Sequence, residues 1–141
     1  MAMAFTSIKE RQILPTEVAD YLYWKTNEYN KKDSGTSGKG IIYASQKFGI
    51  RTIPIKSRNQ LIQELSSGKI VYAAMTIGRF ATKKWNHAIL IYDYKNDMAK
   101  TIASDPLDAN KNGLVSIDTI WNEKSNDPDD ISGGAALYAL Y

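Results

Sequence analysis

A histidine and an aspartate carry the spacing in this chain that points to catalysis. His87 is the single histidine, and it opens the apolar run in the stretch KKWNHAILIYDYKNDMAKTIASDP. Asp105, followed by a proline, lies 18 residues further on (105 − 87), which fits one β-hairpin of about eight residues a side. Such a hairpin returns the carboxylate beside the imidazole, where it fixes the tautomer and makes the other ring nitrogen more basic. The spacing therefore predicts a general base with an orienting carboxylate, against the alternative of a histidine without a role.

The 141 residues include no cysteine. A thiol nucleophile, a thiolate metal ligand and a disulfide are therefore all excluded for this chain. We also predict no cofactor and no bound metal. The predicted base thus has no obvious nucleophile to activate.

The segment DANKNGLVSIDT imitates the start of a calcium-binding loop, with Asp108, Asn110 and Asn112 at alternate positions before Gly113. The twelfth position should supply a bidentate glutamate, and here it is Thr119. A turn with Asn-Gly at its tip explains the same residues. We therefore favour a turn and leave weak calcium binding by the Asp108–Asn112 loop open.

Two other polar segments are interpreted as surface loops. DSGTSGKG, residues 33–40, has the composition of a phosphate loop, but it lacks the first glycine at the required spacing. Gly40 also stands where a magnesium-binding hydroxyl belongs. The acidic cluster Asp127, Asp129 and Asp130 has no evident catalytic partner, so we predict a solvated turn.

Composition indicates one ordinary globular domain. Hydrophobic residues make up 43% of the chain and charged residues 23%, and 141 residues suffice for a real core. The net charge of +3 is spread along the chain without a basic stripe, so nucleic acid is not an expected partner. The longest apolar run, residues 88–92, is too short for membrane insertion.

Helical patterns come first along the chain and strand patterns follow. We expect helices over residues 1–12, 16–27, 41–48 and 57–67, with one or two further turns at 117–122. Strands are expected over residues 69–77, 87–94, 99–104, 114–117 and 133–141. This order predicts an α+β fold in which N-terminal helices pack on an antiparallel sheet formed by the C-terminal half.

Five segments of the chain resemble a known family. They are MAMAF, LSSGKIVYAAM, NHAILIYDY, ASDPL and TIWN, which together span nearly all 141 residues. Their order is similar to that of the papain-like cysteine peptidases of the bacteriocin-leader (double-glycine) peptidase-like family. The resemblance implies a papain-like fold, with His87 as general base, Asp105 as its orienting residue and a peptide or protein as substrate. It also implies an extracellular or cell-surface location in a bacterium. One departure is Asp93, where the family has glycine in the turn before Tyr94.

A second departure concerns the nucleophile. In the family, a CGxTAMAF-like run places the cysteine at the start of the first helix, after a glutamine that stabilises the oxyanion; this chain has only MAMAF. We therefore expect residues 1–141 to be a single, N-terminally truncated peptidase-like domain, inactive as given. Thr6 and Ser7 lie a turn or more too far along the helix to replace the cysteine.

The alternative function is a naturally cysteine-free papain-like module that binds peptides without cutting them. A third hypothesis is another papain-like acyl-transfer enzyme, such as a toxin or transferase. Met1, Met3 and Phe5, together with Trp85, are expected to form an exposed apolar patch. Such a patch predicts self-association of the chain or capture of an extended peptide.

Overall fold

The computed structural model describes residues 1–30, 35–82 and 86–141 of the chain. Its helices are α1 (Ala2–Lys9), α2 (Pro15–Lys25), α3 (Gly38–Lys47), α4 (Arg58–Ser66) and α5 (Ile117–Asn122). Its strands are β1 (Tyr29–Asn30), β2 (Gly35–Thr36), β3 (Thr52–Pro54), β4 (Ile70–Met75), β5 (His87–Lys95), β6 (Lys100–Ser104), β7 (Gly113–Ser116) and β8 (Leu137–Leu140). Two short 3₁₀ turns, η1 (Asn96–Met98) and η2 (Ala109–Lys111), complete the described elements. The predicted α+β class is confirmed.

Side chains at the helix starts explain where two of the helices begin. Ser57 Oγ accepts a hydrogen bond from the Gln60 backbone N–H at 3.1 Å, so α4 starts where the sequence predicted. Ser37 Oγ accepts from the Gly40 N–H in the same way. Helix α3 consequently begins three residues before the predicted position at Ile41, within the segment that the sequence analysis assigned to a loop.

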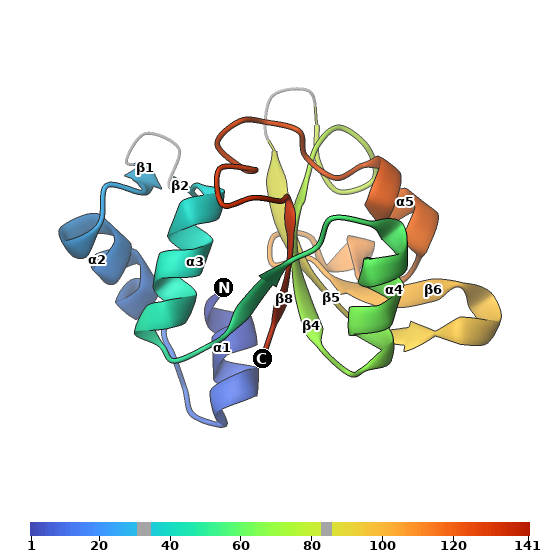
Figure 1. Ribbon diagram of the computed structural model, residues 1–141, viewed down its shortest axis with the longest axis horizontal. Coiled ribbons are helices and arrows are strands. Elements are labelled where there is room, and N and C mark those ends of the chain that lie inside the picture. Colours follow the sequence, from blue (N-terminus) through green and yellow to red (C-terminus); the bar gives the residue numbers. More distant parts are fainter. Residues whose placement is uncertain (31–34, 83–85) are drawn as a thin grey trace.

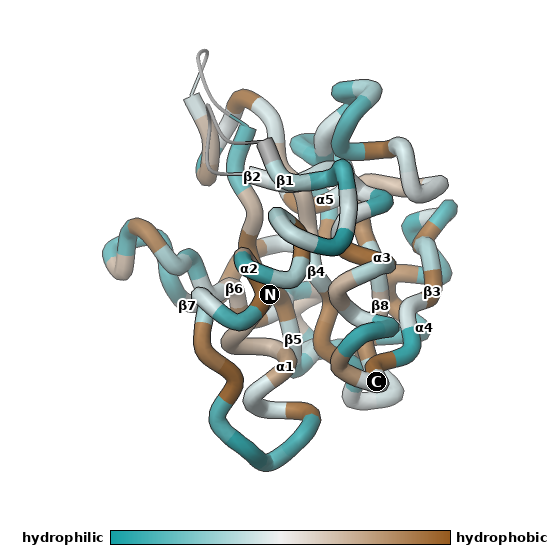
Figure 2. The backbone as a smooth tube through the Cα atoms, turned by 90° about the vertical axis from the view of Figure 1, so that its left-hand side faces the viewer, coloured by the Kyte–Doolittle hydropathy of each residue, from teal (hydrophilic) through white to brown (hydrophobic). Residues whose placement is uncertain are grey.

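Six strands form one antiparallel sheet in the order β3-β8-β4-β5-β6-β7. Helices α1, α2 and α3 lie together on one side of the central strands, and α4 and α5 lie on the other side (Figure 1). The central strands are hydrophobic along much of their length, whereas the outer loops are mostly hydrophilic (Figure 2). The core is therefore built from both faces of β4, β5 and β8, including the fully buried Val71, Ile91 and Leu137.

The hairpin of β5 and β6 determines the spacing between His87 and Asp105. Leu90 pairs with Ser104, and the register shifts between Tyr92 and Lys95. Asp93 lies at this irregularity with φ 57°, a left-handed conformation that favours glycine. A glycine, which the resemblance implies at this position, would adopt this conformation without strain. Aspartate tolerates the same conformation, and its carboxylate pairs with the Lys95 ammonium at 2.7 Å.

The predicted apolar patch at the start of the chain is only partly present. Phe5 is fully buried and packs against Phe48, with ring centroids 5.5 Å apart, because the apolar face of α1 turns into the core. Met3 is exposed and Met1 is half-buried. Trp85 lies outside the described residues. Self-association of the chain stays a prediction. Among the helices that the structure describes, none is long and apolar enough to cross a membrane.

Candidate functional site

His87 is the first residue of β5, where it pairs with Met75 of β4. Its ring nitrogen Nε2 lies 2.7 Å from Asp105 Oδ1, and Asp105 directly follows β6. The two side chains are 14% and 1% exposed, so the contact is largely shielded from water. The predicted meeting of His87 with Asp105 is confirmed.

A tight turn after β6 holds the Asp105 carboxylate. Oδ1 accepts hydrogen bonds from the backbone N–H groups of Leu107 at 2.8 Å and Asp108 at 3.1 Å, in addition to the contact with His87. The Asp105 N–H donates to Asn112 Oδ1 at 2.6 Å. Asp105 therefore cannot swing away from His87 without breaking several hydrogen bonds.

The structure shows how the residues of the Asp108–Asn112 segment are used in the same turn. The Asn112 side-chain oxygen is engaged by the Asp105 backbone, and Asp108 Oδ1 accepts from the Asn110 N–H. Strand β7 starts at Gly113, as expected for a turn between strands. Among the described residues, no cluster of three or more histidine, aspartate or glutamate side chains could hold a metal ion. Here these residues support Asp105, a role that the sequence analysis missed.

Electrostatics keep the Asp105 carboxylate ionised. Burial by itself raises the pKa of this carboxyl, but the hydrogen bonds from His87 and from the turn outweigh burial, so the pKa lies below its ordinary value. An ionised carboxylate accepts hydrogen bonds only, so a neutral His87 ring carries its hydrogen on Nε2. The lone pair is then on Nδ1, and no described residue hydrogen-bonds that atom. Nδ1 is thus the nitrogen available as a base.

A cavity of about 1210 Å³ lies beside His87. Tyr72 of β4, Ala88 of β5 and the exposed Leu107 form part of its wall. Met1, the residue before α1, also lines this cavity, so the start of α1 and His87 face the same space. Figure 1 shows the N-terminus between α3 and the central strands, at the junction of the two halves of the fold.

The hydroxyl groups of Thr6 and Ser7 do not line the cavity beside His87. Thr6 Oγ1 is hydrogen-bonded to both the N–H and the carbonyl of Ile13, and Ser7 is exposed away from the cavity lining. Thr76 and Thr82 do line the cavity, but no described hydroxyl forms a hydrogen bond with the His87 ring. The expectation that Thr6 and Ser7 cannot act as nucleophile is consistent with their positions.

The acidic segment after α5 differs from its prediction as a solvated turn. Asp127 and Asp129 are exposed, but Asp130 is half-buried and accepts hydrogen bonds from Asn86 Nδ2 and Ser125 Oγ. All three aspartates line the cavity. The segment is a turn, but the prediction that it is solvated is wrong for the Asp130 side chain, because the segment folds back against the start of β5.

The glycines of the segment DSGTSGKG allow close packing between elements. A side chain at Gly38 would collide with the Asp130 carbonyl, and one at Gly40 would collide with Thr36. The glycines therefore let α3 approach β2 and the acidic segment. Residues 33 and 34 of that segment lie outside the described residues.

Comparisons with known proteins place this geometry in a known fold. No protein-family model matches the chain, and no curated protein matches it. The structure is similar to the crystal structure of the peptidase domain of Streptococcus ComA, a bi-functional ABC transporter involved in a quorum-sensing pathway. The TM-score is 0.64 with 20% sequence identity, over 96% of this chain and 82% of that one. The fold is papain-like and peptidase-like. The resemblance stated from five short motifs is thus confirmed at the level of the fold.

Proposed function

We propose that the cavity beside His87 is a peptide-binding cleft, and that His87 and Asp105 are the base and orienting residue of a cysteine-peptidase mechanism. The observation that carries this proposal is the 2.7 Å contact between Asp105 Oδ1 and Nε2 of His87, a residue that lines the cavity. Two strand ends and a hydrogen-bonded turn maintain this contact. Such support from strand ends and a turn is expected where an imidazole must stay in a fixed orientation.

In such a mechanism the thiol sits at the start of a helix and opposite the histidine. The helix N-terminus and a nearby imidazole both favour the thiolate, which is the attacking form. In this structure the start of α1 and His87 border one cavity. The chain contains no cysteine, so as given it is expected to bind peptide without cutting it.

The cleft also has the surface that an extended peptide requires. Leu107 is 84% exposed and Ile77 is 56% exposed, and both line the cavity that contains His87. Exposed apolar side chains at the edge of a cleft gain free energy when a partner covers them. The similarity to a peptidase domain supports a peptide as that partner.

A non-catalytic, peptide-binding module is the second candidate. The absence of cysteine favours it, because no thiol exists to form an acyl-enzyme. The ordered His87–Asp105 pair favours the first candidate, a cysteine-peptidase site, since peptide binding alone does not require an oriented base. The two candidates differ in whether the imidazole activates a thiol that is introduced at the start of α1.

A chain carrying the extension Cys-Gly-Ala ahead of Met1 separates the two. The extension follows the spacing of the family run CGxTAMAF when AMAF is matched to residues 2–5. We expect iodoacetamide to alkylate this cysteine at pH 6 at least about tenfold faster than a free thiol, because the imidazole and the helix start lower its pKa. Hydrolysis of peptides from a mixed library should appear at the same time.

The control is the same extended chain with His87→Ala. It should alkylate at the rate of an ordinary thiol and cleave no peptide. Equal alkylation rates with and without His87 would reject the catalytic assignment and leave the binding module. The chain without the extension should neither react with iodoacetamide nor turn over peptide. Cleavage by that chain would reveal a nucleophile other than cysteine.

A further inference from the structure

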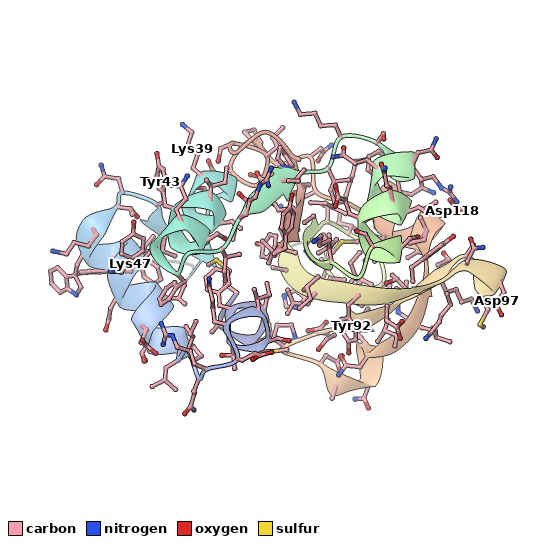
Figure 3. The ribbon with its side chains drawn as sticks, turned by 60° about the horizontal axis from the view of Figure 1, so that its bottom comes forward. Lys39, Tyr43, Lys47, Tyr92, Asp97 and Asp118 are labelled. Atoms are coloured by element: carbon pink, nitrogen blue, oxygen red, sulfur yellow. The ribbon has the colours of Figure 1, made fainter. Side chains whose placement is uncertain are left out.

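The wall of the cleft carries an excess of negative charge. Glu28, Asp127, Asp129 and Asp130 all line the cavity, and no lysine or arginine does so among residues 1–30, 35–82 and 86–141. This contrasts with the net charge of +3 for the whole chain. Lys39 belongs to the neighbouring helix α3, but its side chain points outward from the molecule (Figure 3). Among the described residues, acidic side chains therefore outnumber basic ones at the cleft.

These carboxylates lack counter-ions within the described part of the chain. Glu28 accepts a hydrogen bond from Ser37, Asp127 from the Asp129 N–H, and Asp130 from neutral amide and hydroxyl groups. Four ion pairs occur among the described residues, and none of them includes a carboxylate of this wall. A cation entering the cleft would therefore meet acids that no described side chain already neutralises.

Tyr72 also contributes a largely buried side chain to the wall of this cavity. It is 8% exposed and lines the cavity, yet no described residue hydrogen-bonds its hydroxyl. The fully enclosed side-chain atoms without a partner among the described residues are Ser45 Oγ and Asp105 Oδ2, and the Tyr72 hydroxyl is not one of them. Burial, with the charge of Asp130, raises the pKa of this phenol, so it stays protonated and can donate. Buried donors normally have a hydrogen-bond partner, and for a residue that lines a cleft this partner is water or a bound ligand.

We propose that the cleft selects peptides with a lysine or arginine side chain beside the segment that reaches His87. The cation would lie against Asp127, Asp129 and Glu28. A backbone carbonyl of the peptide would accept a hydrogen bond from the Tyr72 hydroxyl. A divalent metal fits less well, because the described acids form no cluster with metal-ligand spacing. Carboxylates that are spread along a cleft suit a long, flexible cationic side chain, because such a side chain can reach any one of them, whereas a metal ion needs several ligands around one point. This inference rests on the proposed peptide binding and adds its charge preference.

Three fluorescein-labelled peptides, (Ala-Lys)₄, (Ala-Gln)₄ and (Ala-Glu)₄, test the preference on the full chain. Fluorescence anisotropy at low salt should give the tightest binding for the lysine peptide and the weakest for the glutamate peptide. Raising the salt from about 0.05 to 0.5 M should reduce the difference, since screening weakens exposed charge pairs. Equal affinity for the three peptides would overturn the charge preference while leaving peptide binding intact. No binding of any peptide would overturn both proposals.

Charge-neutral variants locate the effect. Asp127→Asn and Asp129→Asn keep the size of each side chain. Each should lower the affinity for the lysine peptide about threefold, which is the size of effect expected when one exposed ion pair is lost. Neither change should affect the glutamine peptide. The control is Asp97→Asn, which removes the same charge at the distant tip of the β5–β6 hairpin (Figure 3). An equal loss in the control would show that net charge, and not the cleft, sets the preference.

Tyr72→Phe tests the hydrogen bond. This change keeps the buried ring and removes only the hydroxyl. It should lower the affinity for the lysine and the glutamine peptide by the same factor, about fivefold, because the Tyr72 hydroxyl donates its hydrogen bond to the peptide backbone, which both peptides share. Unchanged affinity for both peptides would remove Tyr72 from the site.

Discussion

Replacement of Asp105 tests whether its carboxylate organises the turn that positions His87. One oxygen, Oδ1, accepts hydrogen bonds from His87 Nε2 and from the N–H groups of Leu107 and Asp108. Asp105→Ala removes this acceptor and leaves three hydrogen-bond donors without their partner. Asp105→Asn retains an amide oxygen that can occupy the Oδ1 position, but it removes the charge. The two variants therefore separate the loss of the acceptor from the loss of the charge.

The expected magnitudes follow from these contacts. A hydrogen bond to a charged group contributes about 1.5–3 kcal/mol, and an unsatisfied buried donor costs about 1–3 kcal/mol. Water reaches part of the turn, so the three bonds do not add fully, and we expect Asp105→Ala to lower the free energy of unfolding by about 3 kcal/mol. Asp105→Asn should cost about 1–2 kcal/mol, because its amide nitrogen would enter the place of Oδ2, which has no described partner.

Urea unfolding followed by tryptophan fluorescence at pH 7 measures these differences. If Asp105→Ala and Asp105→Asn lower the free energy of unfolding equally, the charge of Asp105 matters and the acceptor oxygen adds nothing further. An Asp105→Ala variant as stable as the wild type would refute the idea that Asp105 is the hub of the turn. The chain's single histidine also gives a direct local probe, since one imidazole resonance set reports the orientation of His87 in each variant.

The same variants predict how stability depends on pH. The pKa of the Asp105 carboxyl is lower in the folded protein than its ordinary value of 3.8, so the unfolded chain binds this proton more readily. The stability contributed by the carboxylate is therefore complete above about pH 4 and is lost as the pH falls through the lower folded value. The difference in unfolding free energy between wild type and Asp105→Asn should shrink below about pH 4. A difference that stays constant from about pH 7 to about pH 3 would contradict the lowered pKa.

Two further predictions concern the elements around the cleft. Gly38→Ala should lower the free energy of unfolding by about 1–3 kcal/mol, because the new methyl group would collide with the Asp130 carbonyl and the Tyr138 hydroxyl; thermal unfolding measures this loss, and an unchanged melting temperature would contradict the packing. Ser57→Ala removes the acceptor for the Gln60 N–H at the start of α4 and should cost about 1 kcal/mol by urea unfolding, whereas Ser57→Asp should retain most of the stability.

Local patterns predicted most of the fold, since most elements follow from residues close together in sequence. The strands β4, β5 and β6 have β-branched and aromatic runs bounded by turn residues, and α4 has a capping serine. Strand β3 was missed because it has three residues, one of them Pro54, and gains its structure by pairing with β8. Its place at the edge of the sheet is where proline is tolerated.

The candidate site divides in the same way. His87 and Asp105 were predictable because one hairpin connects them and its length fixes their register. Asp130 and Tyr72 were not, because they reach the cavity through packing between segments far apart in sequence. Asn112 could have been found from the Asn-Gly turn signal, but its side-chain oxygen serves the Asp105 backbone, which only the folded turn shows.

The position of β8 between β3 and β4 has a consequence for how the protein folds. A ribosome releases residues 52–75 long before residues 137–140, so β3 and β4 must wait for a strand made much later before the middle of the sheet can form. The cost of closing such long loops slows folding. Until β8 inserts, β4 has an unpaired edge, and so does β3, which makes the nascent chain prone to pairing with other chains. Folding of residues 1–141 should therefore include a late step in which β8 joins the sheet.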